Sequence, residues 1–249
     1  MPNLGLGTSL SSSGLVTPGI VTDSLVLKHN YAAGGVVPVS DGAASFDGSS
    51  DYVDLENLST WDFINNFSLG AWIFHKSGGD PYNAIISNYE TSKGWDLILD
   101  AGVLRMGLRG ASGIDTGGSP GSDLRDNKWH YISATCATSA INIYVDGVLQ
   151  ETTAGTWTPT TTSSVNTYIG KRTGIATFNG YICNVGIWDA VLTQPQVKSI
   201  MWKNYAGLTS SETDNLVSWW NLDEETATDG TAGSGGVKDH EGSNHGTLT

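Results

Sequence analysis

The stretch KWHYISATCATSAINIYVDGVLQ, residues 128–150, decides the fold. Between residues 129 and 136 two sets of side chains alternate, which is the pattern of a strand with two different faces. A second alternation, at residues 141–145, follows a short turn. Asp146 and Gly147 then form the dipeptide that best tolerates a positive φ at both centres of a type I′ turn, so the chain is predicted to fold back there. The stretch therefore predicts strands joined by tight turns.

Similar strand signals recur at short spacing between residues 47 and 202, and the breaks between them carry Gly, Asn, Asp or Pro. Many short strands of even spacing are typical of a β-sandwich or jelly roll. One short helix is predicted over residues 193–204, because Thr193 is an N-cap candidate and Pro195 lies in the first turn. A last strand is predicted over residues 216–222. The predicted fold class is all-β with one short helix.

Four blocks of the chain resemble the laminin-G-like, concanavalin A-like lectin/glucanase jelly roll, and they occur in the right order. These blocks are SFDGSSDYVDL (45–55), FSLGAWIF (67–74), the 128–150 hairpin and YIGKRTGIATFNGYICNVGIWDAVL (168–192). The resemblance implies a sandwich of two antiparallel sheets. The ends of the chain depart from the family, because residues 216–224 and the final DHEGSNHGTLT resemble a segment that ordinarily precedes the opening strands. A circularly shifted edge strand is therefore expected.

Two parts are predicted along the chain. Residues 1–40 form an extended N-terminal arm, in which residues 21–28 and 36–39 supply one strand or two. Residues 41–249 form the jelly roll, including its C-terminal strand and a tail rich in Gly and Asp. Residues 21–46 resemble segments that precede such domains in virion structural proteins of tailed phages, especially marine ones.

Composition excludes several kinds of partner. The net charge of −13 leaves no basic stripe for phosphate groups, so no nucleic-acid partner is expected. No apolar run is long enough to cross a bilayer, so no membrane insertion is expected. The start of the chain lacks the features of a secretory signal. This favours a virion protein made in the host cytoplasm, and an extracellular or cell-surface location is the alternative. Cys136 and Cys183 are predicted to be buried free thiols.

Catalysis is not predicted. Glycanases of this architecture place two carboxylates on one face of a strand, in a run such as Glu-x-Asp-x-Glu, and the chain has no such run. Asp51 and Asp54 would face opposite sides of a strand. No nucleophile elbow surrounds any Ser. His130 is expected to pack or to hydrogen-bond to the backbone.

No cofactor is predicted except Ca²⁺, for which Asp47, Asp51 and Asp54 are the candidate ligands. The favoured interpretation is that these carboxylates cap turns instead. His240 and His245 lie near acidic residues in the C-terminal tail, which is expected to be solvated rather than to form a metal site.

Carbohydrate binding uses aromatic rings that stack on sugar faces, together with polar side chains that bind the hydroxyls. Tyr82, Asn83, Trp157 and Arg172 lie in predicted loops and are the candidate ligand-binding residues. The alternative is that they cap the ends of the sandwich or contact another subunit. Other Trp rings are predicted to fill the core, namely Trp72, Trp129, Trp188 and one of Trp219 and Trp220.

Three functions are consistent with these patterns. The leading hypothesis is a non-enzymatic virion structural protein of a tailed phage, either a capsid decoration or a fibre or appendage protein. Its partners would be other virion proteins and further copies of itself in a homo-oligomer. The second is a carbohydrate-binding module or adhesin whose partner is a cell-surface glycan. The third is a glycan-active enzyme.

Overall fold

The computed structural model describes residues 36–57, 66–78, 81–90, 93–117, 121, 123–159, 165–174, 177–224 and 236–249. Residues Pro38–Thr249 form one compact unit. The strand predicted at residues 21–28 lies outside the described residues. Residues 36–39, predicted as a second strand, form no strand. Pro38 has no N–H to donate to a ladder, and the Val39 carbonyl accepts a hydrogen bond from the Asn184 side chain instead.

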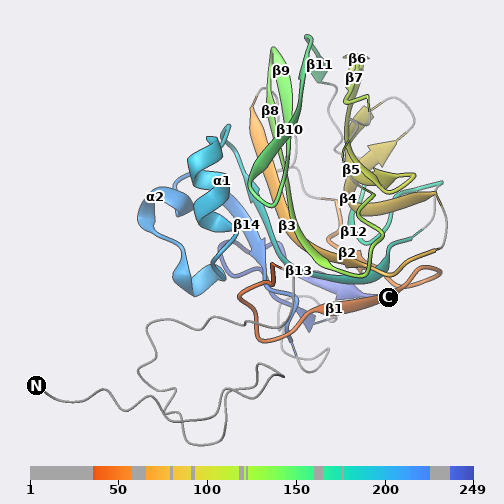
Figure 1. Cartoon of the computed structure of the whole chain (residues 1–249), viewed down its shortest axis with the longest axis vertical. Helices are drawn as coiled ribbons and strands as arrows, with labels where there is room; N and C mark the ends of the chain where they lie inside the picture. The colour runs from red at the N-terminus through yellow and green to blue at the C-terminus, as the bar shows by residue number, and fades with distance from the viewer. Residues whose placement is uncertain are drawn as a thin grey trace, which may run out of the picture. The chain divides into compact units, whose positions relative to one another are not determined.

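The described strands form two antiparallel sheets, as predicted (Figure 1). Sheet A has seven strands, in the order β1 (Ala44–Asp47), β13 (Asn179–Trp188), β3 (Phe67–His75), β8 (Trp129–Ala137), β9 (Ala140–Val145) and β10 (Val148–Ala154), with β14 (Leu216–Trp220) also paired to β13. Sheet B has nine strands, in the order β11 (Thr158–Pro159), β6 (Val103–Ser112), β5 (Lys93–Asp100), β4 (Tyr82–Glu90), β12 (Thr167–Ile169), β2 (Val53–Asp54), β16 (Gly246–Leu248) and β15 (Gly236–Val237), with β7 (Ile114–Asp115) paired to β6.

The predicted helix is α1 (Gln194–Ile200), and it is shorter than expected at its C-terminal end. Thr193 and Gln196 form a capping box at its start. A 3₁₀ turn (Tyr205–Gly207) and a one-turn helix α2 (Ser210–Thr213) follow. None of the described helices is both long and apolar enough to cross a membrane.

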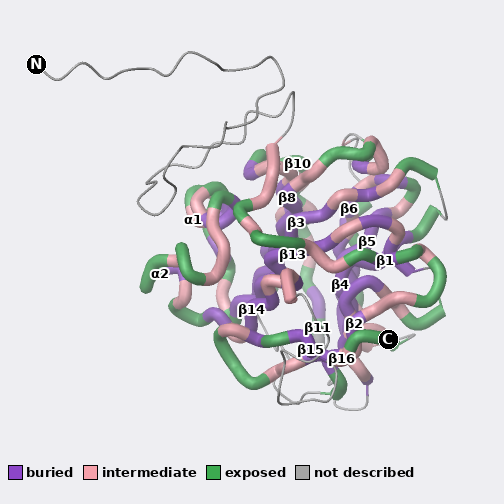
Figure 2. Tube along the Cα trace, turned by 90° about the horizontal axis from the view of Figure 1, so that it is seen from below, coloured by how far each residue is buried: buried purple, intermediate pink, exposed green. Residues whose placement is uncertain are grey.

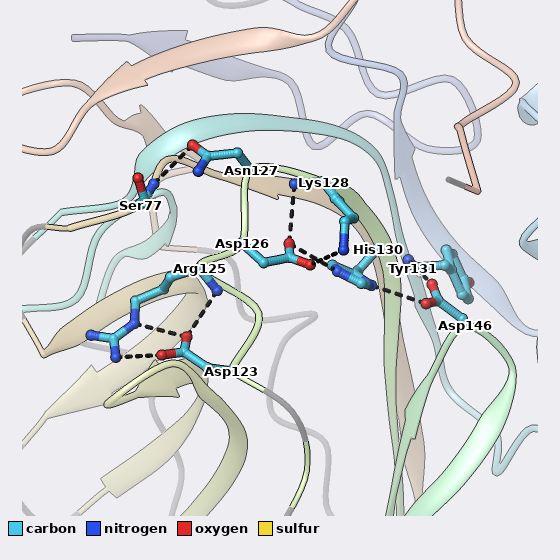
Figure 3. Close-up of polar contacts among 9 residues, drawn as sticks. All are labelled: Ser77, Asp123, Arg125, Asp126, Asn127, Lys128, His130, Tyr131 and Asp146. Carbon is cyan, nitrogen blue, oxygen red and sulfur yellow. Dashed lines mark hydrogen bonds and ion pairs between the residues drawn. The ribbon is translucent and has the colours of Figure 1, made fainter. Parts of the chain in front are cut away.

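The 128–150 stretch folds as predicted, into β8, β9 and β10. Asp146 and Gly147 both have positive φ, at 51° and 73°, as a type I′ turn requires. The Asp146 carboxylate accepts the backbone N–H of Tyr131 at 2.9 Å and lies 2.9 Å from Nδ1 of His130. Nε2 of His130 lies 3.2 Å from Asp126 (Figure 3). His130 was expected to pack or to bond to backbone, but it joins two carboxylates and so links the loop before β8 to the hairpin turn.

The buried Trp rings occupy two apolar layers rather than one. Trp220 lies in the core between the sheets, as predicted. Trp72 and Trp188 are fully buried on the other face of sheet A, where their indole N–H groups donate to the backbone carbonyls of Met201 and Glu212. Both carbonyls belong to the helical segment, so the helices cover this face. Accordingly β3, β13 and β14 are buried along most of their length (Figure 2).

Two other Trp rings lie outside the core between the sheets. Trp219 packs edge-on against Trp188 in the layer under the helices, with the two ring centres 6.0 Å apart. Trp129 is half-buried and packs against Phe74, with the two ring centres 5.7 Å apart, so its predicted place in the core is wrong.

The C-terminal segment belongs to the sandwich. β14 pairs with residues 185–188 of β13, and β1 pairs with residues 179–182, so the two strands share one edge of β13. The expectation of a solvated tail is wrong for residues 236–249, because β15 and β16 extend sheet B. The buried Asp239 carboxylate accepts the backbone N–H groups of Trp219, Glu241 and Asn244 at 3.0–3.1 Å. This tail is fixed because its polar groups replace water as hydrogen-bond partners.

Candidate ligand-binding face

The outer face of sheet B is the candidate site. The odd-numbered residues of β5 and the even-numbered residues of β6 fill the core. The charged residues that alternate with them along each strand therefore point outward. The outward set includes Asp96 and Asp100 on β5 and Arg105 and Arg109 on β6. The helices α1 and α2 lie on the side of sheet A, away from β4, β5 and β6 (Figure 1). We call this outer surface of sheet B the polar face.

Arginine–carboxylate pairs cover the centre of the polar face. Arg105 lies 3.0 Å from Asp100 and 3.2 Å from Asp115. Arg109 forms a second ion pair with Asp115. Asp115 reaches the face because β7 folds back onto β6, with Asp115 opposite Gly107. Each guanidinium is thus held in place by at least one carboxylate.

A buried ion pair lies beside these groups. Arg172, from the loop after β12, reaches Asp96 at 2.9 Å, and Asp96 is 1% exposed. Burial raises the pKa of Asp96, although the Arg172 and Arg109 charges oppose the shift. The Arg172 guanidinium lies 3.7 Å from the ring centre of Tyr89. Gly107 makes room for the pair, since a Cβ there would lie 2.2 Å from Oδ1 of Asp96.

Two further Tyr rings lie where β2 and β12 meet. The rings of Tyr52 and Tyr168 are perpendicular, with centres 5.5 Å apart. The Lys171 ammonium lies 3.6 Å from the Tyr52 ring centre and 5.0 Å from that of Tyr168. Ser87 on β4 donates its hydroxyl to the Lys171 carbonyl at 2.8 Å, which anchors the loop carrying both Lys171 and Arg172.

The structure brings two of the four predicted ligand residues to this face. Tyr82 is 39% exposed at the start of β4 and is the cross-strand partner of Asp100. Arg172 lies near the other end of β4, beside Tyr89. Asn83 faces inward and is 1% exposed.

Trp157 is 7% exposed and packs against Phe67 in the core, at 6.2 Å between ring centres. Trp157 does lie in a loop, between β10 and β11, but its ring is buried in the core. Its predicted display to a ligand is therefore wrong, and the burial fits the alternative that the ring caps an end of the sandwich. Tyr82 was likewise predicted to lie on a loop, and it begins β4 instead.

Sequence reasoning missed Asp96, Arg109 and Asp115, which the structure places at the centre of the face. The signal was present in LRMGLR (104–109), where charged residues and Gly alternate with apolar ones. That alternation predicts a strand with one charged face.

The carboxylates predicted as Ca²⁺ ligands accept hydrogen bonds from backbone N–H groups in turns. The Asp47 carboxylate accepts the N–H groups of Ser50, Asp51 and Ser49, which lower its pKa to about 2. Asp51 accepts the N–H of Asp47, and Asp54 accepts that of Glu56. These contacts are those of the favoured turn interpretation, and Ca²⁺ binding here stays a prediction.

Another group of residues could hold a divalent metal. Asp223 and Glu224 follow β14, and His240 follows β15; their ligand atoms lie within 4.8 Å of one another. Burial and the Lys238 charge lower the pKa of His240, which favours the neutral form of the ring that can bind a metal. His245 is not one of this group, and its Nδ1 accepts the Asp239 N–H.

Comparison with known proteins agrees with this architecture. Residues 47–198 match the family model of the concanavalin A-like lectin/glucanases superfamily. The chain belongs to this superfamily. A search of curated proteins found no match.

Solved structures of similar fold include three proteins linked to carbohydrates by their descriptions. A proposed carbohydrate binding protein from Bacteroides ovatus is 19% identical, with a TM-score of 0.58, over 82% of this chain and 56% of that one. This superfamily member thus spans little more than half of the Bacteroides protein. The second is domain 4 of AbnA, an extracellular arabinanase from Geobacillus stearothermophilus, solved with arabinotriose. It is 18% identical, with a TM-score of 0.54, and the match covers 68% of this chain and 82% of that one. The third is the CBM40 of a Ruminococcus gnavus sialidase, bound to α2,3-sialyllactose. It is 12% identical, with a TM-score of 0.50, and the match covers 64% of this chain and 96% of that one. These likenesses show the fold.

Proposed function

We propose that this chain is a non-catalytic carbohydrate-binding domain whose ligand lies on the polar face. The observation that carries the proposal is the combination there of partly exposed Tyr rings with ordered Arg–carboxylate pairs. Tyr rings supply flat apolar surfaces for sugar C–H groups, and the Arg and Asp side chains supply donors and acceptors for hydroxyls. The descriptions of the structural neighbours, two of them solved with bound sugars, support the same class of ligand.

The arrangement of carboxylates supports binding rather than hydrolysis. A glycosidase needs one carboxyl group as proton donor and a second as nucleophile or base, both open to the substrate. Asp96 and Asp115 are neighbours across Gly107, but Asp96 is sealed behind Arg172 and Asp115 is held by two guanidinium groups. Neither can approach a glycosidic bond without breaking these ion pairs.

The proposal is tested by affinity electrophoresis of the purified chain in gels containing soluble polysaccharides. Tyr89→Ala removes the ring beside Arg172, and we expect it to weaken retention by about tenfold, which corresponds to about 1.4 kcal/mol. Trp202→Ala is the matched control, because this ring is 52% exposed and follows α1 beside sheet A. Equal loss in both variants, or none in Tyr89→Ala, would contradict the proposed site.

The virion role predicted from the sequence is a second proposal. The observation in its favour is the resemblance of residues 21–46 to phage virion segments, of which residues 21–35 lie outside the described residues. On a virion, the polar face would bind a cell-surface glycan, and the chain would assemble with other virion proteins and with itself. In the alternative setting the same domain would act outside the cell or at its surface. Mass spectrometry of purified virions tests this role, which fails if the protein is absent from them.

A further inference from the structure

We infer that the polar face selects a neutral glycan over an acidic one, an inference that rests on the proposed carbohydrate-binding function. Three of the four arginines of the chain, Arg105, Arg109 and Arg172, lie on this face. In a chain of net charge −13, such a concentration would by itself suggest a site for anions. The contacts of the three guanidinium groups instead favour a neutral ligand.

Carboxylates of the face compensate each guanidinium charge. Arg172 is paired with Asp96, Arg109 with Asp115, and Arg105 with both Asp115 and Asp100. Three arginines thus share three carboxylates. A ligand carboxylate or sulfate group would meet guanidinium groups whose charge is already neutralised, and it would lie close to the Asp oxygens that neutralise them.

The exposed atoms of these pairs match hydroxyl groups. A hydroxyl both donates and accepts a hydrogen bond, whereas an ionised carboxylate or sulfate only accepts. Asp115, whose side chain is 38% exposed, offers acceptor oxygens beside the N–H donors of Arg105 and Arg109. A sugar hydroxyl can therefore donate to Asp115 and accept from a neighbouring guanidinium. An anionic group could use the donors but would be repelled by the acceptors.

Among the described residues, Lys171 is the remaining cation of the face, and it makes no ion pair with any of them. Its ammonium lies against the Tyr52 and Tyr168 rings instead. The negative faces of the rings partly offset its charge. At longer range the acidic chain as a whole repels polyanions, most strongly at low ionic strength. A single ring-bound ammonium does not reverse that repulsion.

The experiment compares two classes of soluble polysaccharide with the full chain, by affinity electrophoresis. The neutral probes are arabinan, xylan and a mixed-linkage β-glucan, and the acidic probes are polygalacturonate, alginate and chondroitin sulfate. Each is run at about 20 mM and about 300 mM NaCl, which moves the screening length from above to below the spacing of surface charges. We expect retention by at least one neutral probe, with less than a twofold change between the two salt concentrations, and none by the acidic probes.

Asp115→Asn sharpens the test, because it keeps the size of the side chain and removes the repelling charge. This variant should gain retention by polygalacturonate at low salt and lose it at high salt, while Trp202→Ala behaves as the wild type. A thermal melt of each variant confirms that it is folded. Salt-sensitive retention of the wild type by the acidic probes, equal retention by both classes, or an unchanged Asp115→Asn would overturn the inference and leave carbohydrate binding intact. Retention by no probe of either class would instead overturn the proposed function and the inference with it.

Discussion

Asp96→Ala is the most direct test of how the polar face is held together. The side chains of Asp96 and Arg172 are 2% and 13% exposed, and the pair is closed at 2.9 Å. Removal of one partner of a buried pair leaves the other charge without compensation, which typically destabilises a protein by about 3–5 kcal/mol. Arg172 keeps its contact with Tyr89 and some exposure to water, so we expect the lower end, about 3 kcal/mol.

Urea unfolding followed by Trp fluorescence measures this loss, since the chain has nine Trp residues. With a denaturant slope of about 3 kcal/mol per M, the midpoint should fall by about 1 M. The double variant Asp96→Leu/Arg172→Met is the matched control, because apolar replacement of both partners is often nearly neutral. A loss below about 1 kcal/mol in Asp96→Ala, or a double variant at least as unstable as the single one, would refute the buried-pair reasoning.

Three further predictions concern groups elsewhere in the sandwich. Burial disfavours the charged form of His130, but Asp146 and then Asp126 outweigh it and raise the pKa of the ring. The stabilisation by the protonated ring is then complete below the unfolded-state pKa of about 6.5 and is lost as the pH rises through the folded-state pKa. His130→Gln should therefore flatten the urea stability profile above about pH 6.5. Asp239→Ala leaves three backbone N–H groups without their acceptor and should destabilise the fold by about 2–3 kcal/mol, with faster hydrogen exchange at the Asn244 amide. Burial raises the pKa of Cys136 and brings that of Cys183 to about 12, so an aromatic disulfide reagent should modify both only in urea; rapid reaction of the native protein would contradict the burial.

Much of the fold could be predicted from local pattern. The alternation in residues 129–145 and the Asp146–Gly147 dipeptide predicted the β8–β9–β10 unit, and Thr193 with Pro195 predicted the start of α1. These predictions succeed because strand pleat, turn geometry and helix capping depend on residues close together in the chain.

The candidate site was only half predicted, and the failures share one cause. Trp157 and Asn83 resemble exposed loop residues in sequence, yet both are buried. Whether a residue at the end of a strand faces water depends on which distant segment packs over it. For Trp157 that segment includes Phe67, which lies far from it in the chain.

The sequence by itself determined that this protein is a two-sheet jelly roll with one short helix. Only the tertiary structure decided that Arg172 meets Asp96, that Asp115 lies between two arginines, and that Asp239 holds the C-terminal segment against β14. The physical reason is the range of the interactions. The period of a strand assigns each side chain to a face, but strand order and packing between distant segments decide which side chains become neighbours on that face.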